Sequence, residues 1–214
     1  MTFDTIIRGG TIATASDTFA CDIGITDGRI TALGTNLGAA KEIVDATGKL
    51  VLPGGIDSHV HISQPSGPDI VMADDFASAT RSAAFGGNTM VLPFALQQKG
   101  ESLREVVSAY HKKAEGQCYI DVSFHLIVAD ASDAVLGQEL PALVHDGYTS
   151  FKVFMTYEGL ALSDMEMLNV MSVARDTGAL FRRTGTAPSR ASRRRATRRS
   201  CPTRSPSCPC PART

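Results

Sequence analysis

The sequence contains no run of about 18 or more uncharged apolar residues, which is close to the shortest length that crosses a bilayer as a helix. Its N-terminus also lacks the charged segment followed by an apolar segment that a secretion signal needs. Cysteines are few and odd in number, and only two of the five, Cys21 and Cys118, lie in sequence that looks foldable. We therefore expect a reduced, cytoplasmic protein with no membrane contact.

Residues 181–214 lack acidic residues, lysine, Val, Ile, Leu and Met, and consist mostly of Arg, Pro, Ser, Thr and Ala. All 22 acidic residues precede Leu180, together with 11 of the Lys and Arg, so that residues 1–180 carry a net charge of −11. The other ten basic residues are all arginines of the last segment. A segment without aliphatic side chains cannot build a core, and we expect a tail that is disordered or read out of frame.

Residues 1–50 alternate apolar and polar side chains in short runs that turn signals separate, which is typical of strands. Asp27-Gly28 stands between two such runs and predicts a tight hairpin. We expect a small β-domain here, the N-terminal part of a β-sandwich if the family resemblance below holds. The expected strands are Phe3–Arg8, Thr11–Thr14, Asp22–Ile25 and Arg29–Leu33.

From Leu50 to about residue 180 the pattern changes to short apolar runs that alternate with helix-length segments, which indicates four βα units. The expected strands are Leu50–Ile56, Thr89–Phe94, Val122–Ala129 and Ser150–Phe154. The expected helices are Asp74–Phe85, Ser102–Glu115, Ser132–His145 and Ser163–Arg175. Ser102 with Glu105, and Ser163 with Glu166, have the spacing of capping boxes, and a fifth strand can begin near Gly178.

Four βα units fit the first half of an eight-stranded (β/α)8 barrel or a complete doubly wound sheet, and periodicity alone does not choose between them. A doubly wound nucleotide-binding sheet usually carries a glycine-rich phosphate loop. Neither G-x-G-x-x-G nor G-x-x-x-x-G-K-[ST] occurs in the sequence, which favours the barrel over the doubly wound sheet.

His59 and His61 follow the apolar run Val51–Ile56 directly. In a strand, residues i and i+2 face the same side, so both imidazoles would point into one site at the strand's C-terminal end. Imidazole nitrogens are good ligands for zinc and similar ions. Two incidental histidines at a strand end are an equally good interpretation of this pair alone.

Lys152 stands among apolar residues in the strand Ser150–Phe154, followed closely by Tyr157. Burial lowers the pKa of a lysine, and a neutral amine reacts with carbon dioxide to form a carbamate, an anionic oxygen bridge between two cations. Taken alone, a lysine that extends from an edge strand to solvent is the more usual explanation.

The segments Gly54–His61 and Ser150–Tyr157 together resemble the dihydropyrimidinase and hydantoinase branch of the cyclic amidohydrolases. Ala84–Thr89 and Phe124–Asp130 resemble the same branch, so the resemblance extends from residue 3 to about residue 180. It implies a (β/α)8 barrel over residues 51–180, beside a β-sandwich to which residues 1–50 contribute. It also implies that full-length relatives form homo-oligomers, typically tetramers.

The resemblance further implies a centre of two divalent metal ions, usually zinc, at the C-terminal face of the barrel. His59 and His61 would hold one ion, and carboxylated Lys152 would bridge both. A metal-bridging hydroxide would attack the ring carbonyl of a small cyclic amide or ureide, and Tyr157 would stabilise the oxyanion. His125 is better explained as a hydrogen-bonded core histidine, and Asp57 as a residue that orients its neighbours.

The sequence departs from this family after residue 180. The family uses two further histidines and an aspartate from later strands, yet no histidine follows His145 and no aspartate follows Asp176. We therefore expect an incomplete, inactive copy of such an enzyme, whose unpartnered apolar surfaces promote aggregation. A real arginine-rich tail that binds nucleic acid is a weaker alternative, because no aromatic residues are interleaved with the arginines.

Other functions remain open within the same superfamily. An allantoinase-like or dihydroorotase-like enzyme is an open alternative, because substrate choice depends on loops, of which Ser63–Ala73 is one. Relatives that act as oligomeric scaffolds without catalysis often lose metal ligands, whereas His59, His61 and Lys152 all remain here.

Overall fold

A computed structural model describes residues 2–67 and 69–184 of the chain. The sequence predicts a disordered or out-of-frame tail over residues 181–214. From residue 185 onward, this tail lies outside the described residues. The chain divides into two compact units, Met1–Ile56 with Ala84–Met90, and Asp57–Ala83 with Val91–Thr214. Among the described residues, no helix combines the length and apolar character needed to span a membrane.

The first unit is built from short strands. They are β1 (Phe3–Arg8), β2 (Thr11–Ala13), β3 (Thr18–Ala20), β4 (Asp22–Thr26), β5 (Arg29–Gly34), β6 (Ala40–Asp45) and β7 (Leu50–Val51), with β8 (Gly55–Asp57) and β9 (Asn88–Val91) where the chain passes between the units. One sheet has the order β5-β4-β1-β6 and another the order β3-β2-β7. β1 pairs antiparallel with β4 and parallel with β6.

The Asp27-Gly28 dipeptide connects β4 and β5, which pair antiparallel as the sequence predicts. Both residues have positive φ angles, 51° at Asp27 and 70° at Gly28, as a two-residue type I′ hairpin turn requires. The sequence patterns missed β3 and β6. Every residue of β6 after Ala40 is exposed, so no alternation of buried and exposed side chains marks this strand.

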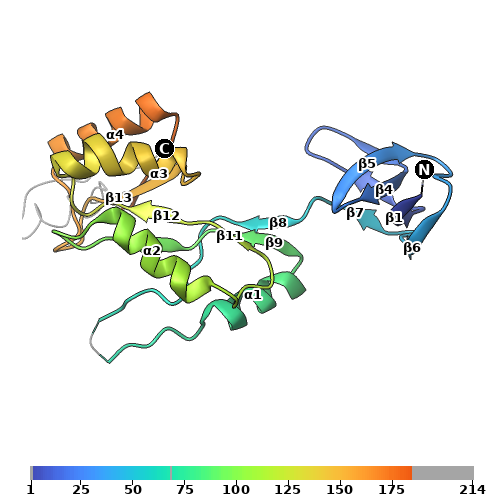
Figure 1. Ribbon diagram of the computed structural model, residues 1–214, viewed down its shortest axis with the longest axis horizontal. Coiled ribbons are helices and arrows are strands. Elements are labelled where there is room, and N and C mark those ends of the chain that lie inside the picture. The colour runs from blue at the N-terminus through green and yellow to red at the C-terminus, as the bar shows by residue number, and fades with distance from the viewer. Residues whose placement is uncertain (1, 68, 185–214) are drawn as a thin grey trace, which may run out of the picture. The chain divides into compact units, whose positions relative to one another are not determined.

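The second unit contains a parallel four-stranded sheet in the order β10-β12-β13-β14, with its helices (Figure 1). Its elements are α1 (Phe76–Phe85), β10 (Phe94–Leu96), α2 (Leu103–Ala114), β11 (Asp121–Val122), β12 (His125–Ile127), the π-helix η1 (Val135–Glu139), α3 (Leu140–His145), β13 (Ser150–Phe154), α4 (Asp164–Thr177) and β14 (Leu180–Thr184). Helices α3 and α4 lie next to each other. Strands and helices alternate along the chain here, as the sequence predicts.

The two faces of this parallel sheet carry different side chains. Leu126, Phe151 and Val153 belong to the main core, which α2, α3 and α4 complete with buried leucines and valines. Phe94 and Ile127 lie on the other face of the sheet, where they form a smaller cluster with Phe154. Alternation along each strand therefore separates a helix-covered face from a face that bears the candidate site residues.

Several expected strands are shorter than the apolar runs that predicted them. Leu50–Ile56 is interrupted between β7 and β8, where Pro53 has no N–H to donate to a neighbouring strand. Pro93 likewise separates β9 from β10. By contrast β13 coincides with the expected Ser150–Phe154, because a strand buried along its whole length reads as one uninterrupted segment.

Strand β14 confirms the fifth strand expected near Gly178 and continues into the segment assigned to the tail by composition. It pairs parallel with β13 from Leu180 to Thr184, and Phe181 packs against the main core. An aromatic side chain and backbone hydrogen bonds are sufficient to hold a strand at this position, even though two of its residues are arginines.

Candidate metal centre

His59 and His61 follow β8, and their side chains gather around one aromatic ring. The ring of Phe94, at the start of β10, is 4.9 Å from the His59 ring and 5.0 Å from the His61 ring, measured between centroids. The two imidazoles are themselves 5.5 Å apart. Both histidines are exposed and lie beyond the end of β8, so their shared contact with Phe94 does not arise from the strand alternation on which the sequence prediction rests.

Lys152 reaches the same place from β13. Its Nζ atom lies 3.8 Å from the centre of the Phe94 ring, and the residue is 3% exposed. Within the described part of the chain its ammonium group has no hydrogen-bond or salt-bridge partner and contacts aromatic rings instead. Burial, and secondly the charge of Arg182, lowers the pKa of Lys152. Such a shift raises the fraction of neutral amine, the form that can react with carbon dioxide.

The hydrogen bonds around the histidine pair fix its geometry. His61 Nδ1 lies 2.5 Å from Gln64 Oε1 and donates to this carbonyl oxygen, which leaves the lone pair on Nε2. The backbone N–H of His59 donates to Asp57 Oδ1 at 3.1 Å. Asp57 therefore orders the chain ahead of the pair, in agreement with its expected role.

His125 is a buried histidine with partners on both ring nitrogens. Nδ1 lies 2.6 Å from the Ser150 hydroxyl and Nε2 lies 2.8 Å from the Ser58 carbonyl oxygen. Burial is the main cause of its lowered pKa, so that the neutral ring is favoured. The expectation of a hydrogen-bonded core histidine is confirmed, and its ring lies tilted against Phe94, with the centroids 5.1 Å apart.

Arg182 enters this cluster from β14, where it is the direct register partner of Lys152 on β13. Its Nη1 atom donates to the Ser58 carbonyl oxygen at 2.7 Å and lies 2.9 Å from His125 Nε2. Its Nη2 atom lies 3.4 Å from His59 Nδ1. Arg182 therefore contacts Ser58, His125 and His59 at the same time.

Tyr157 lies just beyond β13 and is 55% exposed. Its ring packs edge-on against Phe154, with the centroids 5.0 Å apart, and Phe154 in turn lies 5.1 Å from the Lys152 Nζ atom. The phenol is thus connected to the cluster through Phe154, with its ring accessible to solvent.

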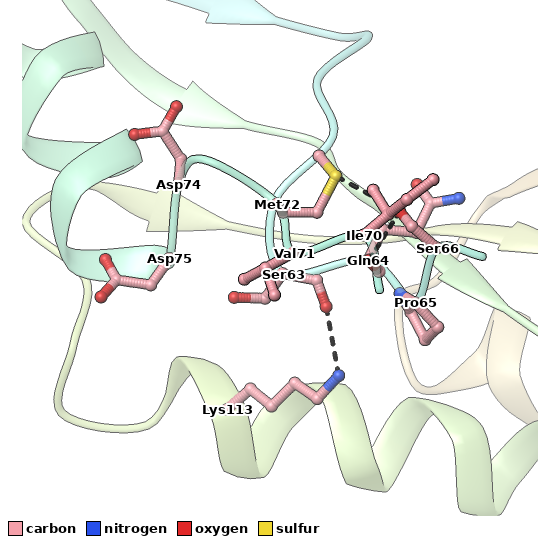
Figure 2. A pocket seen from close by; sticks show the side chains of 10 residues that line it. All are labelled: Ser63, Gln64, Pro65, Ser66, Ile70, Val71, Met72, Asp74, Asp75 and Lys113. Atoms are coloured by element: carbon pink, nitrogen blue, oxygen red, sulfur yellow. Dashed lines mark hydrogen bonds between the residues drawn. The ribbon is translucent and has the colours of Figure 1, made fainter. Parts of the chain in front are cut away.

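A cavity of about 410 Å³ is lined mainly by residues of the loop between β8 and α1 (Figure 2). Lys113 from α2 reaches across to the loop and donates to the Ser63 carbonyl oxygen at 3.2 Å. Gln64 lines this cavity and also binds His61, which connects the cavity to the histidine pair. The remaining lining residues are Pro65, Ser66, Ile70, Val71, Met72, Asp74 and Asp75.

The described residues do not provide a complete ligand set for a metal ion. No group of three or more His, Cys, Asp or Glu in the described part of the chain could hold one. A structural or catalytic zinc site needs three or four protein ligands, while His59 and His61 supply two and an unmodified Lys152 supplies a cation. The described residues therefore supply only part of the two-metal centre that the resemblance implies.

Known proteins match this chain in both sequence and fold, although no model of a known protein family matches it. A D-hydantoinase from Streptomyces coelicolor is 46% identical over 188 residues, which are 85% of this chain and 40% of that enzyme. The dihydropyrimidinase of Rattus norvegicus is 38% identical over 184 residues, 82% of this chain and 35% of its own length. The crystal structure of a dihydropyrimidinase from Brevibacillus agri superposes with a TM-score of 0.79 at 42% identity, over 84% of this chain and 39% of that one.

The chain belongs to the D-hydantoinase and dihydropyrimidinase family. It spans about 40% of the length of these relatives and corresponds to the N-terminal part of their fold. The chain that carries His59, His61 and Lys152 accordingly comes from a lineage of hydantoinase and dihydropyrimidinase enzymes.

Two members of the cluster, Phe94 and Arg182, were not identified from the sequence. Phe94 follows Pro93 at the end of an apolar run, where it reads as one more core residue. Arg182 is one of ten arginines in a segment whose composition predicts no structure. Arg182 follows Leu180 by two residues, and residues two apart in a strand face the same side of the sheet. This spacing was the only signal in the sequence that Arg182 could lie on the same face as residues of the neighbouring strands.

Proposed function

We propose that this chain is the N-terminal part of a metal-dependent hydrolase that opens cyclic amides of the hydantoin and dihydropyrimidine type. In this proposal the parallel sheet is the first half of a (β/α)8 barrel, and the strands up to residue 50 belong to a β-sandwich. The 214-residue chain itself does not turn over substrate, because it lacks the further histidines and the aspartate that the resemblance requires.

The observation that supports the proposal is the common contact with Phe94. His59, His61 and Lys152, which we propose as ligands, reach this ring from two separate segments of chain, the residues after β8 and strand β13. Unrelated core residues have no reason to bring two imidazoles and an unpaired lysine to one ring, because an ammonium without a carboxylate is costly to bury. The lowered pKa of Lys152 suits a lysine that becomes a carbamate.

Each residue of the chain would have a separate task in the complete site. His59, His61 and the carbamate of Lys152 would hold the divalent ions, most simply zinc. Bound ions of this kind supply a hydroxide at neutral pH. Tyr157 would donate its phenolic hydrogen to the oxygen that becomes negative as the amide opens. Gln64 would hold the His61 ring through Nδ1.

A chimera tests the proposal. Residues 2–180 of this chain would be joined to the corresponding C-terminal part of the Streptomyces coelicolor D-hydantoinase, expressed with zinc, and assayed on hydantoin, 5,6-dihydrouracil, allantoin and dihydroorotate. We expect ring opening of the first two compounds by the chimera and none by the 214-residue chain. Preference for allantoin or dihydroorotate would instead assign the chain to those enzymes.

Two lysine variants provide the matched control. Lys152→Ala in the chimera should abolish activity, while Lys112→Ala, an exposed lysine of α2 outside the cluster, should retain it. A folded, zinc-loaded chimera without activity on any of the four compounds would support a scaffold relative. Turnover by the 214-residue chain would contradict the claim that it is incomplete. A homotetramer remains a prediction for the full-length form, to be checked on the chimera by light scattering.

A further inference from the structure

Arg182 places a permanent positive charge beside the histidine pair. β14 pairs with β13 so that Arg182 and Lys152 are register partners and project from the same face of the sheet. The half-buried guanidinium donates to the Ser58 carbonyl oxygen and lies within 3.4 Å of His59 Nδ1. Arg183, the next residue, is exposed and contacts Met155 Sδ at 3.4 Å instead.

The contact with His59 uses the electron pair that a metal would need. A neutral imidazole has one nitrogen that carries hydrogen and one that carries a lone pair. A guanidinium can only donate, so the Nη2 contact requires the lone pair of His59 to be on Nδ1. The hydrogen of His59 is then on Nε2, and neither ring nitrogen is free to bind a cation.

The charges around the pair act in the same direction. Arg182 and Lys152 are the basic groups that face it, and Asp57, which binds the His59 backbone N–H, is the acidic one. His61 and His125 are the remaining titratable groups in contact with the cluster. His59 is exposed, and the Arg182 guanidinium places a positive charge beside it, so a divalent ion that approaches His59 is repelled.

We propose that Arg182 is an internal cation that occupies the lone pair of His59 and prevents the His59 and His61 pair from binding a divalent metal ion. The arginine thus stabilises the metal-free cluster by binding Ser58 and His59 at once. The chimera described above contains only residues 2–180 of this chain and therefore lacks Arg182. Its activity tests the proposed function and is independent of the role of Arg182.

Metal titration of the full 214-residue chain tests this role. Co²⁺ and Zn²⁺ would be titrated into the unaltered chain and into Arg182→Met, which keeps the length of the side chain without its charge. Calorimetry and the visible spectrum of bound Co²⁺ would report binding. We expect at least tenfold tighter binding by Arg182→Met, no change in the matched variant Arg183→Met, and loss of the gain in His59→Ala/Arg182→Met. Circular dichroism would verify that each variant is folded.

Two results would overturn the inference. One is equal metal affinity in Arg182→Met and the unaltered chain, and the other is a gain that persists without His59. If Arg182→Met does not fold, the unaltered chain still decides the matter. Zinc binding by the unaltered chain should be weak and unaffected by His59→Ala, whereas tight binding that depends on His59 would refute the role of Arg182.

Discussion

The Nζ atom of Lys152 lies 3.8 Å from the centre of the Phe94 ring. The negative face of an aromatic ring attracts a cation, which partly offsets the cost of burying one. The same ring contacts both imidazoles of the histidine pair. Phe94 is therefore a packing residue on which the geometry of the whole cluster depends.

Phe94→Ala should lower the free energy of unfolding by about 3 to 5 kcal/mol, because the ring is 1% exposed and its removal leaves a cavity. Phe94→Leu fills most of the space and should cost about 1.5 kcal/mol or less. Urea denaturation followed by circular dichroism measures both values. Equal losses in the two variants would mean that packing volume is not what Phe94 contributes.

Lys152→Met should raise the free energy of unfolding at pH 7 by on the order of 1 kcal/mol, since an apolar side chain replaces the cation of a residue that is 3% exposed and contacts aromatic rings. Its pKa is lowered in the folded chain, so between that pKa and the ordinary value of 10.5 the unfolded chain binds more protons. Stability due to Lys152 therefore increases as pH rises through this window and is constant below it.

Denaturation at a series of pH values from 7 to about 11 measures this effect. The increase in stability should be present in the unaltered chain and in Lys112→Met, an exposed lysine, and absent in Lys152→Met. A Lys152→Met profile with the same slope as the unaltered chain would exclude Lys152 as its source.

Ser163→Ala should cost about 1 kcal/mol of stability, because Ser163 and Glu166 form a reciprocal capping box at the start of α4. Hydrogen bonds from Ser163 lower the pKa of Glu166 below 4.5. The stability due to this carboxylate is thus present above pH 4.5 and lost as pH falls through its folded pKa. Acid titration of the unfolding free energy should show this loss, reduced in Ser163→Ala. Ser102→Ala, at a cap without the reciprocal bond, should leave it unchanged.

Leu168→Lys with Met171→Lys should reduce self-association, measured by light scattering. Both residues are about half exposed on α4 and line an apolar cavity of about 250 Å³ with Met155, Met167 and Phe181. Surface charges oppose association through such a patch. Leu33→Lys, at an exposed leucine of the first unit, should have less effect. Equal improvement by both changes would mean that added charge alone is responsible.

Tyr157→Phe should reduce ring opening by the chimera by roughly 10²- to 10³-fold in kcat, the usual effect of losing one oxyanion donor. The side chain is 55% exposed, so the free energy of unfolding should change by less than about 0.5 kcal/mol. Tyr119→Phe, at a similarly exposed tyrosine, is the control and should retain activity. An active Tyr157→Phe chimera would remove Tyr157 from the proposed mechanism.

Sequence patterns predicted the long elements of this fold well, because each has its own local signal. α2 and α4 begin after the expected capping serines, Ser102 and Ser163, and β13 is a fully buried apolar run. The same patterns predicted His59 and His61 on one side of a strand, whereas both histidines follow β8 and meet at the Phe94 ring. They could not reveal Phe94 or Arg182 as members of the cluster, because those contacts depend on which strands become neighbours.

The order of the parallel sheet matches the order of its strands in the sequence, with β12, β13 and β14 each paired to the preceding member of the sheet. Each connection contains a helix or a short loop, so every new strand meets a surface that the preceding βα unit has already formed. Contacts that are close in sequence form rapidly, and ribosomes deliver a chain from its N-terminus. The second unit can therefore fold strand by strand during synthesis, and Arg182 would reach the histidine cluster as one of its last additions.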